Sequence, residues 1–457
     1  MKKYISLMNR KEGGIIMMAS EVLAELKDII NEERIRKNNQ QSSSLGNTGQ
    51  MIVAPESEEE IIKLVSYANQ HGKTVSVVSG GTKRGFGGTT ETEDIGLSLE
   101  NYRGIIEHTV GDMTVTVKAG TPFKELQDYL AQYNQKISLD PAWPEVATIG
   151  GVIAANDSGP KRLGYGSARD VVIGLRIAYP DGTVIRSGGK VVKNVAGYDM
   201  NKLFIGSMGT LGVMTDITLK LRPLPKYESL ILLSFSNEDL QVIQSFVVKL
   251  LDSMMEPVSL ELLSPSLAER LLGQRRYTLA ISLEDVESSV HYQEDFIQKM
   301  VPTGADIQIR EKEKAIEFWE EFYKIGPNGT KEPSDNETEA ALKIGVVNLD
   351  VLKVIQESEL IRDSHNLCIE AHGGLGHGLC QMNLSGASKD VEAAIYQIRS
   401  FVQGLGGYVT IKHLPLLLRK KISVWGETSS YFFILEGIKK KIDPKKILNP
   451  KRFVGGI

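Results

Sequence analysis

Two glycine-rich segments constrain this chain more than any other feature of its sequence. The first is the run at 79–88, Ser-Gly-Gly-Thr-Lys-Arg-Gly-Phe-Gly-Gly, in which half of the residues are glycine. Glycine lets successive backbone N–H groups converge on an anion, and a ligand can come close because no Cβ stands in the way. Lys83 and Arg84 add positive charge to the same turn, so the segment predicts a pyrophosphate site.

The position of this segment argues against two common nucleotide motifs. The surrounding pattern predicts a βαβ unit, with strands at 51–53 and 74–78 on either side of a helix that starts near Ser57. A Rossmann-type glycine motif follows the first strand and opens a helix, whereas this segment follows the second strand. The Walker pattern is absent as well. Taken alone, the segment would equally fit a flexible surface loop.

A second glycine-rich segment favours a ligand site over a flexible surface loop. The run at 148–159, Thr-Ile-Gly-Gly-Val-Ile-Ala-Ala-Asn-Asp-Ser-Gly, combines small residues with hydrogen-bonding side chains. We expect such a strip to lie flat against a large planar ligand and to donate hydrogen bonds to it. Two segments of this type predict one extended ligand that is held from both sides.

Composition narrows the class of protein. The chain has 457 residues, enough for two or three domains, and its net charge of -4 gives no reason to expect binding to nucleic acid or an anionic membrane. Its two cysteines, Cys368 and Cys380, argue against a disulfide framework or a cysteine-held iron–sulfur cluster.

No apolar run is long enough to cross a bilayer, and 15–18 is too short for a signal segment, so we expect a cytoplasmic protein. The purine-rich codons implied by 11–14 suggest that translation begins at Met17 or Met18 rather than at Met1.

Beyond the glycine-rich segments, the pattern of predicted secondary structure changes once. The sequence Arg-Pro-Leu-Pro at 222–225 interrupts a strand pattern, and the two prolines predict a domain boundary there. Strand and helix patterns then repeat up to about 410, which favours an antiparallel sheet with helices on one face.

Four stretches together resemble a known family: 77–88, 140–174, 189–221 and 441–451. They are similar to the FAD-binding domain of vanillyl-alcohol-oxidase (PCMH-type) flavoproteins, in the branch of the D-lactate and glycolate dehydrogenases and the FAD-binding subunit of bacterial glycolate oxidase. The resemblance implies an α+β fold in which a PCMH-type domain of two α+β subdomains precedes a ferredoxin-like antiparallel-sheet domain. We therefore expect an N-terminal extension at 1–48, the FAD-binding domain at 49–225, a second domain at 226–430, and a C-terminal segment at 431–457 that returns to the FAD-binding domain.

The same resemblance implies which residues bind the cofactor. Covalent members of the family carry a histidine in the first loop, where this chain has Thr82, Lys83 and Arg84, so we expect non-covalent FAD. Asn449 would return to the cofactor, although a helix-stop motif after Lys446 would explain it equally well. The implied cofactor-binding residues are Ser79, Gly80, Gly81, Thr82, Lys83, Arg84, Gly85, Gly87, Pro141, Thr148, Gly151, Ala154, Asn156, Ser158, Gly159, Val213 and Asn449.

The active-site motifs depart from the family pattern. Its catalytic members carry His-x-Gly-Asp-Gly-Asn-x-His, whereas this chain has Leu375 in place of the aspartate and Leu379 in place of the last histidine. In a later Glu-His pair, Lys412 replaces the glutamate. Leucine offers a metal no lone pair and an ammonium group repels it, so we expect a site without metal. The three remaining histidines, which could still meet in space, are His372, His377 and His413.

Three functions remain open. The first is the FAD-binding subunit of a glycolate or other 2-hydroxy-acid oxidoreductase complex, with an iron–sulfur subunit and a second flavoprotein subunit as partners. The second is a self-sufficient 2-hydroxy-acid dehydrogenase, with His372 or His413 as base and Arg419 or Arg84 holding the substrate carboxylate. The third is a non-catalytic assembly subunit, which the intact glycine-rich segments argue against. A cell-wall-precursor reductase of the same fold fits the C-terminal motifs less well.

Overall fold

The computed structural model describes residues 23–38, 44–190, 197–236, 240–332 and 337–457. The hypothesis of a start at Met17 or Met18, and part of the stretch at 189–221, therefore lie outside the described residues. Among the described residues, no helix is both long enough and apolar enough to span a bilayer.

A four-stranded sheet opens the fold. Its strand order is β1-β2-β4-β3, with β2 and β3 both parallel to β4. The expected βαβ unit is confirmed, because helix α2 connects β2 to β3. This helix starts at Ser57, whose side chain accepts a hydrogen bond from the Glu60 N–H, and it stops at Gly72 in the left-handed region. The elements are β1 (Ile35–Lys37), β2 (Gly49–Val53), α2 (Glu58–His71), β3 (Val75–Val78) and β4 (Glu93–Ser98).

A five-stranded antiparallel sheet follows, in the order β5-β6-β10-β8-β9, and two short strands, β7 and β11, pair beside it. Its strands are β5 (Ile105–Thr109), β6 (Thr114–Lys118), β8 (Val172–Ala178), β9 (Val184–Gly188) and β10 (Val213–Lys220). The other elements of this part are α3 (Phe123–Ala131), β7 (Gln135–Lys136), α4 (Ile149–Ala155), α5 (Arg162–Tyr165), α6 (Ala168–Val171), α7 (Asn201–Phe204) and β11 (Arg222–Pro223).

Helix α4 corrects our expectation of a flat strip at 148–159. Thr148 caps the helix, and its hydroxyl accepts a hydrogen bond from the Gly151 N–H at 3.4 Å. Glycine in the first turn lets the helix approach β6 closely, because a Cβ on Gly150 would lie 2.8 Å from Ala119 Cβ. Gly150 therefore serves close helix packing, and the chain leaves the helical conformation only at Asn156, which has a left-handed φ of 48°.

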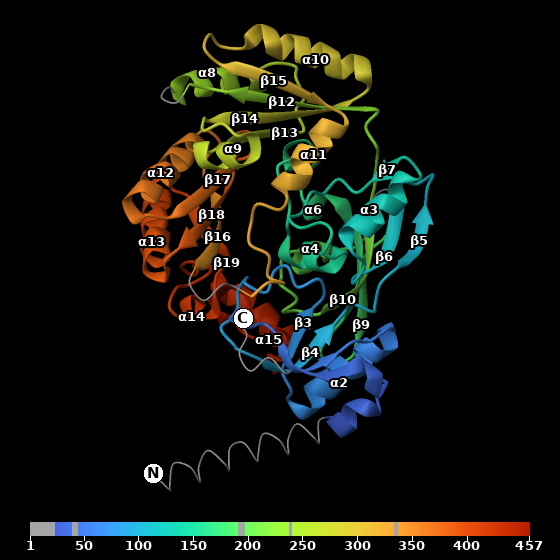
Figure 1. The fold of residues 1–457 in the computed structure, drawn as a ribbon. Helices are drawn as coiled ribbons and strands as arrows, with labels where there is room; N and C mark the ends of the chain where they lie inside the picture. The colour runs from blue at the N-terminus through green and yellow to red at the C-terminus, as the bar shows by residue number, and fades with distance from the viewer. Residues whose placement is uncertain (1–22, 39–43, 191–196, 237–239, 333–336) are drawn as a thin grey trace.

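The remaining chain forms an eight-stranded antiparallel sheet, in the order β15-β12-β14-β13-β17-β18-β16-β19 (Figure 1). Helices α8, α10, α12 and α13 bury one face, while α9 and α11 pack on part of the other face. The strands are β12 (Tyr227–Ser234), β13 (Ser259–Leu263), β14 (Thr278–Asp285), β15 (Asp306–Glu311), β16 (Thr338–Gly345), β17 (Cys368–Gly374), β18 (Leu379–Gly386) and β19 (Tyr408–His413). The helices are α8 (Leu240–Leu251), α9 (Pro265–Leu272), α10 (Glu287–Met300), α11 (Glu313–Phe322), α12 (Asp350–His365) and α13 (Ser388–Gly404).

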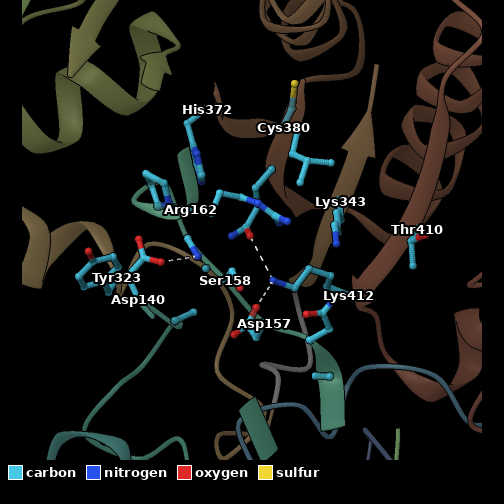
Figure 2. Close-up of a pocket in the computed structure, with 18 of the residues that line it drawn as sticks. Asp140, Asp157, Ser158, Arg162, Tyr323, Lys343, His372, Cys380, Thr410 and Lys412 are labelled. Carbon is cyan, nitrogen blue, oxygen red and sulfur yellow. Dashed lines mark hydrogen bonds and ion pairs between the residues drawn. The ribbon is translucent and has the colours of Figure 1, made fainter. Parts of the chain in front are cut away.

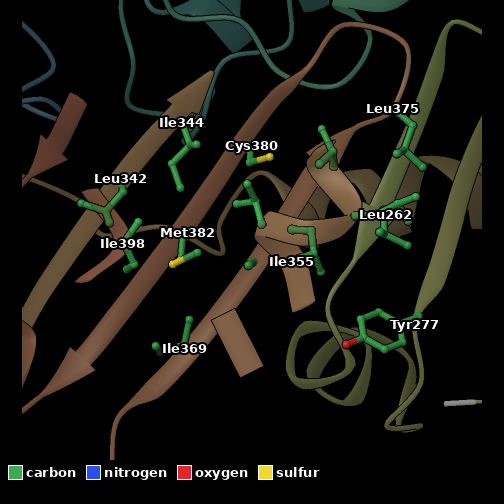
Figure 3. Close-up of a cluster of buried hydrophobic side chains, with 14 of the residues drawn as sticks. Leu262, Tyr277, Leu342, Ile344, Ile355, Ile369, Leu375, Cys380, Met382 and Ile398 are labelled. Atoms are coloured by element: carbon green, nitrogen blue, oxygen red, sulfur yellow. The ribbon is translucent and has the colours of Figure 1, made fainter. Parts of the chain in front are cut away.

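The core under this sheet explains one departure from the family motif. Leu375 is fully buried, and Figure 3 shows it among the apolar side chains that join the strands to the helices, near Leu262. A carboxylate in this cluster would lose its hydration without an ionic partner, at a cost of several kcal/mol. Position 375 therefore contributes to the core of this chain.

The C-terminal segment returns to the first sheet. After α14 (Leu416–Arg419) and α15 (Phe432–Ile442), the chain runs beside β3 (Figure 1). The Val75 N–H donates to Ile447 O at 2.8 Å, and the Asn449 N–H donates to Val75 O at 2.8 Å. Residues more than 370 positions apart are thus joined next to the first glycine-rich segment.

Candidate functional site

A cavity of about 100 Å³, here called the loop cavity, lies between the two glycine-rich segments. Its wall also includes Leu99 and the turn at 208–214. The structure therefore brings together most of the residues that the resemblance implied. Those that line the loop cavity are Ser79, Gly80, Gly81, Thr82, Lys83, Arg84, Thr148, Gly151, Ala154, Val213 and Asn449.

The first segment fits an anionic ligand. In the described part of the chain, the backbone N–H groups of residues 80–83 donate to no carbonyl, and Gly81 has a left-handed φ of 72°. Buried hydroxyl oxygens without a partner among the described residues occur at Ser79 in the loop cavity and at Ser158, which follows α4. Such groups are costly unless a ligand or water satisfies them. A cofactor with phosphates and a polar ring system would supply the missing partners, so the residues present fit FAD.

A larger cavity of about 310 Å³, here called the sheet cavity, continues from the loop cavity at Ala155, which lines both. Asn156, Ser158 and Gly159 border it from the second glycine-rich segment, while Gly85, Gly87 and Pro141 line neither cavity. The opposite wall is the open face of the eight-stranded sheet (Figure 2).

Four side chains on that face come from four neighbouring strands. His372 on β17 pairs with Gln381 on β18, Gln381 pairs with Lys343 on β16, and Lys343 pairs with Thr410 on β19. Residues opposite each other in a ladder point to the same face of the sheet. The strand register thus aligns one row of polar groups along the sheet cavity.

A β-bulge adds a further cation to this wall. Leu342 pairs with Ile411 and Ala341 pairs with His413, which leaves Lys412 as an extra residue on β19. Bulges re-aim side chains and are common beside active sites. As a result, the neighbouring residues Lys412 and His413 both border cavities on the same side of the sheet.

Asp157 connects this wall to both glycine-rich segments. Its carboxylate lies 2.8 Å from Lys412 Nζ (Figure 2) and 2.9 Å from Lys83 Nζ. Burial alone would raise the pKa of Asp157, but the two ammonium groups lower it below its ordinary value. Asp157 is therefore ionised and holds one lysine from each side of the cavity.

His372 and Glu261 form a buried pair in the sheet cavity. His372 Nδ1 lies 2.5 Å from Glu261 Oε1, and both side chains line the cavity. A carboxylate that accepts from Nδ1–H leaves Nε2 with a free lone pair, which is the arrangement of a general base. Sequence reasoning found His372 but missed Glu261. The available signal was an acidic residue inside the otherwise buried strand β13.

Two cations in the sheet cavity have no carboxylate partner among the described residues. They are Lys343 and Arg162, and neither forms an ion pair. Burial lowers the pKa of Lys343 to about 8, and the nearby charges of Lys412 and Arg162 add to the shift. Because an unpaired, partly buried cation is unfavourable, the pair indicates a site for an anion. Sequence reasoning missed both residues.

Asp140 fixes the chain where the second glycine-rich segment ends. Its two carboxyl oxygens accept hydrogen bonds from the N–H groups of Gly159 and Lys161, each at 2.8 Å. Burial raises the pKa of Asp140 to about 7 in spite of these bonds. The side chain lines the sheet cavity next to Tyr323 (Figure 2).

The other proposed catalytic residues lie in different surroundings. The His413 ring packs behind Gly85 and borders only a small cavity of about 40 Å³, and burial together with Arg419 lowers its pKa to about 4. Arg419 donates to the carbonyls of Gly87 and Leu45 and does not line the sheet cavity. This position favours a role behind the first glycine-rich segment rather than at a substrate carboxylate.

His377 does line the sheet cavity, with a pKa that burial lowers. Among the residues that the structure describes, no group of three or more His, Cys, Asp or Glu side chains is arranged to hold a metal ion. Leu375 lies in the core and Lys412 lies beside Asp157, so neither of these side chains offers a lone pair to the cavity.

Comparison with known proteins agrees with this geometry. The family model of the FAD binding domain matches residues 49–188, which include both glycine-rich segments. Glycolate oxidase subunit GlcD of Bacillus subtilis (strain 168) is 26% identical over 418 residues, and the alignment covers 87% of each chain.

Two further relatives match over shorter stretches. Glycolate oxidase subunit GlcE of Escherichia coli (strain K12) is 38% identical over 155 residues, 34% of this chain and 44% of that protein. A mitochondrial D-lactate dehydrogenase (cytochrome) of Arabidopsis thaliana is 32% identical over 235 residues, 49% of this chain and 41% of that protein. Both alignments thus cover less than half of the relative.

The fold has counterparts among solved structures. The 4-ethylphenol oxidase from Gulosibacter chungangensis superposes with a TM-score of 0.75 at 17% identity, over 95% of this chain and 97% of that one. This likeness confirms the expected arrangement of an FAD-binding part followed by an antiparallel-sheet part. FAD-binding sequence, fold and relatives agree: the chain carries an FAD-binding domain on a fold shared with PCMH-type flavoproteins, and it is an FAD-dependent oxidoreductase related to glycolate oxidase subunits and D-lactate dehydrogenases.

Proposed function

We propose that this chain oxidises a small 2-hydroxy acid at the sheet cavity, as the flavoprotein subunit of an oxidoreductase. The observation that carries the proposal is the His372–Glu261 pair in one cavity with the unpaired cations Lys343 and Arg162. A base and a carboxylate site are the two groups that oxidation of a 2-hydroxy acid requires from the protein.

The roles of the residues follow from their chemistry. Lys343 and Arg162 bind the substrate carboxylate, which supplies the missing negative charge in the cavity. His372 Nε2 takes the hydroxyl proton, and Glu261 stabilises the imidazolium that forms. Bound FAD would supply the acceptor for the hydride of the α-carbon, so the product would be a 2-oxo acid. The loop cavity and its free N–H groups would hold the pyrophosphate without a covalent bond.

Anaerobic mixing of the purified holoprotein with glycolate and with each enantiomer of lactate tests this function. We expect one acid to bleach the flavin absorbance within a turnover time. His372→Asn should bind FAD normally and remain oxidised with that acid, while dithionite still reduces its flavin. If none of the acids bleaches the wild-type flavin while dithionite does, the proposal is wrong for this substrate class.

We further propose that the electrons leave to a separate subunit. The two cysteines of the sequence are too few to hold a four-cysteine iron–sulfur cluster, and the relatives include two subunits of glycolate oxidase. Co-expression with the products of neighbouring genes, followed by affinity purification of this chain, tests the partnership. Recovery of an iron-containing subunit together with faster flavin reoxidation supports it. Reoxidation that is equally fast without any partner favours the self-sufficient dehydrogenase.

A further inference from the structure

Within the first glycine-rich segment, the carbonyl groups of residues 81–87 are all hydrogen-bonded. From Gly81 to Gly87, every backbone oxygen accepts a hydrogen bond from within the described chain. The donors are Arg84 N for residue 81, Gly329 N for 82, Phe86 N and Arg452 for 83, Asn47 for 84, Leu414 N for 85, Arg452 for 86, and Arg419 and Asn47 for 87.

Three buried side chains provide most of these bonds. Arg452 donates to Lys83 O at 3.0 Å and to Phe86 O at 3.3 Å, and Asn47 Nδ2 donates to Arg84 O at 2.6 Å. Arg419 reaches Gly87 O from the end of α14. Because the carbonyls are drawn to one side, the N–H groups of residues 80–83 are left for the loop cavity.

The two arginines also leave positive charge next to the segment, Arg419 behind it and Arg452 at the edge of the loop cavity. Arg419 is 3% exposed and Arg452 is 7% exposed, and neither forms an ion pair with a described carboxylate. Burial lowers the pKa of Arg419 to about 9 and that of Arg452 to about 10, and their neighbouring guanidinium groups add to both shifts. Glu93 is the acidic group whose charge raises the pKa of Arg452, but burial raises the pKa of Glu93 itself to about 7. Its charge is therefore an incomplete counterion at neutral pH.

We propose that Arg419, which lines neither cavity, and Arg452, which borders the loop cavity, are positioning residues for the FAD pyrophosphate. They turn the loop carbonyls away from the cofactor, and their charge is neutralised only when the diphosphate is present. The arginines thus couple cofactor binding to folding, since the apoprotein retains two buried cations without a full counter-charge.

The coupling has a measurable signature. A variant that keeps a hydrogen-bond donor but loses the positive charge should remove an unfavourable buried charge from the apoprotein. The same variant should bind FAD more weakly. Arg452→Gln and Arg419→Gln meet that condition because an amide still donates to a carbonyl. Arg103→Gln is the matched control, since Arg103 is 59% exposed at its side chain and makes only a long 3.9 Å contact to Glu125.

The experiment measures the FAD Kd by titration of the apoprotein, and the Tm of apo and holo forms. For each buried-site variant we expect the Kd to rise about tenfold or more, as for loss of a charge-assisted interaction. The apo Tm should stay equal or rise, so that the Tm gain on adding FAD shrinks. Arg103→Gln should leave all three quantities unchanged.

Equal losses of Tm in the apo and holo forms, with an unchanged Kd, would mean that the arginines only hold the fold together, and the proposal would be overturned. Arg452→Lys keeps the charge and one donor, so its Kd should remain within a few fold of the wild-type value. A Kd for Arg452→Lys as high as that for Arg452→Gln would also overturn the role of charge. These binding readouts do not depend on the identity of the substrate.

Discussion

His372 Nδ1 and Glu261 Oε1 lie 2.5 Å apart, and the two side chains come from neighbouring strands, β17 and β13. The pair is 111 positions apart in the chain. Glu261 Oε2 has no partner among the described residues, so the carboxylate is committed to the histidine alone. This geometry gives His372 one defined tautomer and a partner that stabilises its protonated form.

The first prediction concerns this pair. Glu261→Gln should slow flavin reduction by the substrate roughly 10²-fold or more, because the imidazolium loses its counter-charge. FAD content should be unchanged, since Glu261 lies on the sheet side of the cavity. Stopped-flow absorbance at several pH values provides the measurement. The double variant with His372→Asn should be no slower than His372→Asn alone, and a further drop would contradict a shared role.

The second prediction concerns Lys343. Lys343→Met should raise the KM for the acid about tenfold or more with a smaller effect on kcat, because a charge-assisted contact to the carboxylate is lost. With a pKa of about 8, Lys343 is charged below that pH, so the wild-type KM should rise as pH increases through 8. The variant should lack this rise. Lys353→Met, an exposed lysine paired with Asp350, serves as the control.

The third prediction concerns the buried His413. Its pKa in the folded protein is about 4, below the ordinary value of 6.5, so the unfolded chain binds more protons between these values. Stability should therefore fall as pH decreases from about 6.5 toward 4, by about 2 kcal/mol between pH 7 and pH 5 from this group. His413→Asn should remove that contribution to the pH dependence of the free energy of unfolding. Urea unfolding of the holoprotein at both pH values measures it, and an unchanged slope would refute the assignment.

The fourth prediction concerns a buried ionic cluster between the sheets. Glu284 on β14 accepts hydrogen bonds from Lys136 and Tyr165, and it lies 2.6 Å from Lys161, which follows the second glycine-rich segment. Glu284→Gln would leave two buried cations underpaired and should lower the free energy of unfolding by about 3–5 kcal/mol. Glu321→Gln, an exposed partner of Lys324, should change it by less than about 1 kcal/mol. Chemical unfolding of both variants decides the point.

Much of the backbone conformation around the candidate cofactor site was predictable because its signals are local. The positions of the glycines, the cap at Ser57 and the stop at Gly72 report backbone conformations that depend on a few neighbouring residues. The element that was mispredicted, α4, shows the limit of this logic. Small residues are compatible with both a flat strip and a closely packed helix, and the packing against Ala119 decides between them.

The catalytic side of the site was less predictable. Sequence reasoning named His372, His413 and Arg419 as candidate catalytic residues, and of these three the structure places only His372 in the sheet cavity. The residues that accompany it, Glu261 and Lys343, carry no motif of their own. They meet His372 through strand pairing in a sheet whose strands are distant in sequence.

The sequence alone determined two glycine-rich backbone segments suited to a dinucleotide, and it placed Leu375 and Lys412 where the family pattern has carboxylates, because glycine conformations and side-chain chemistry are properties of single positions. Only the tertiary structure decided which charges are paired. Register across β13, β17, β18, β16 and β19 set the neighbours of His372, and the returning C-terminal segment placed Arg452 next to the loop. Those contacts join residues far apart in the chain, and their energies arise only when folding removes water from between them.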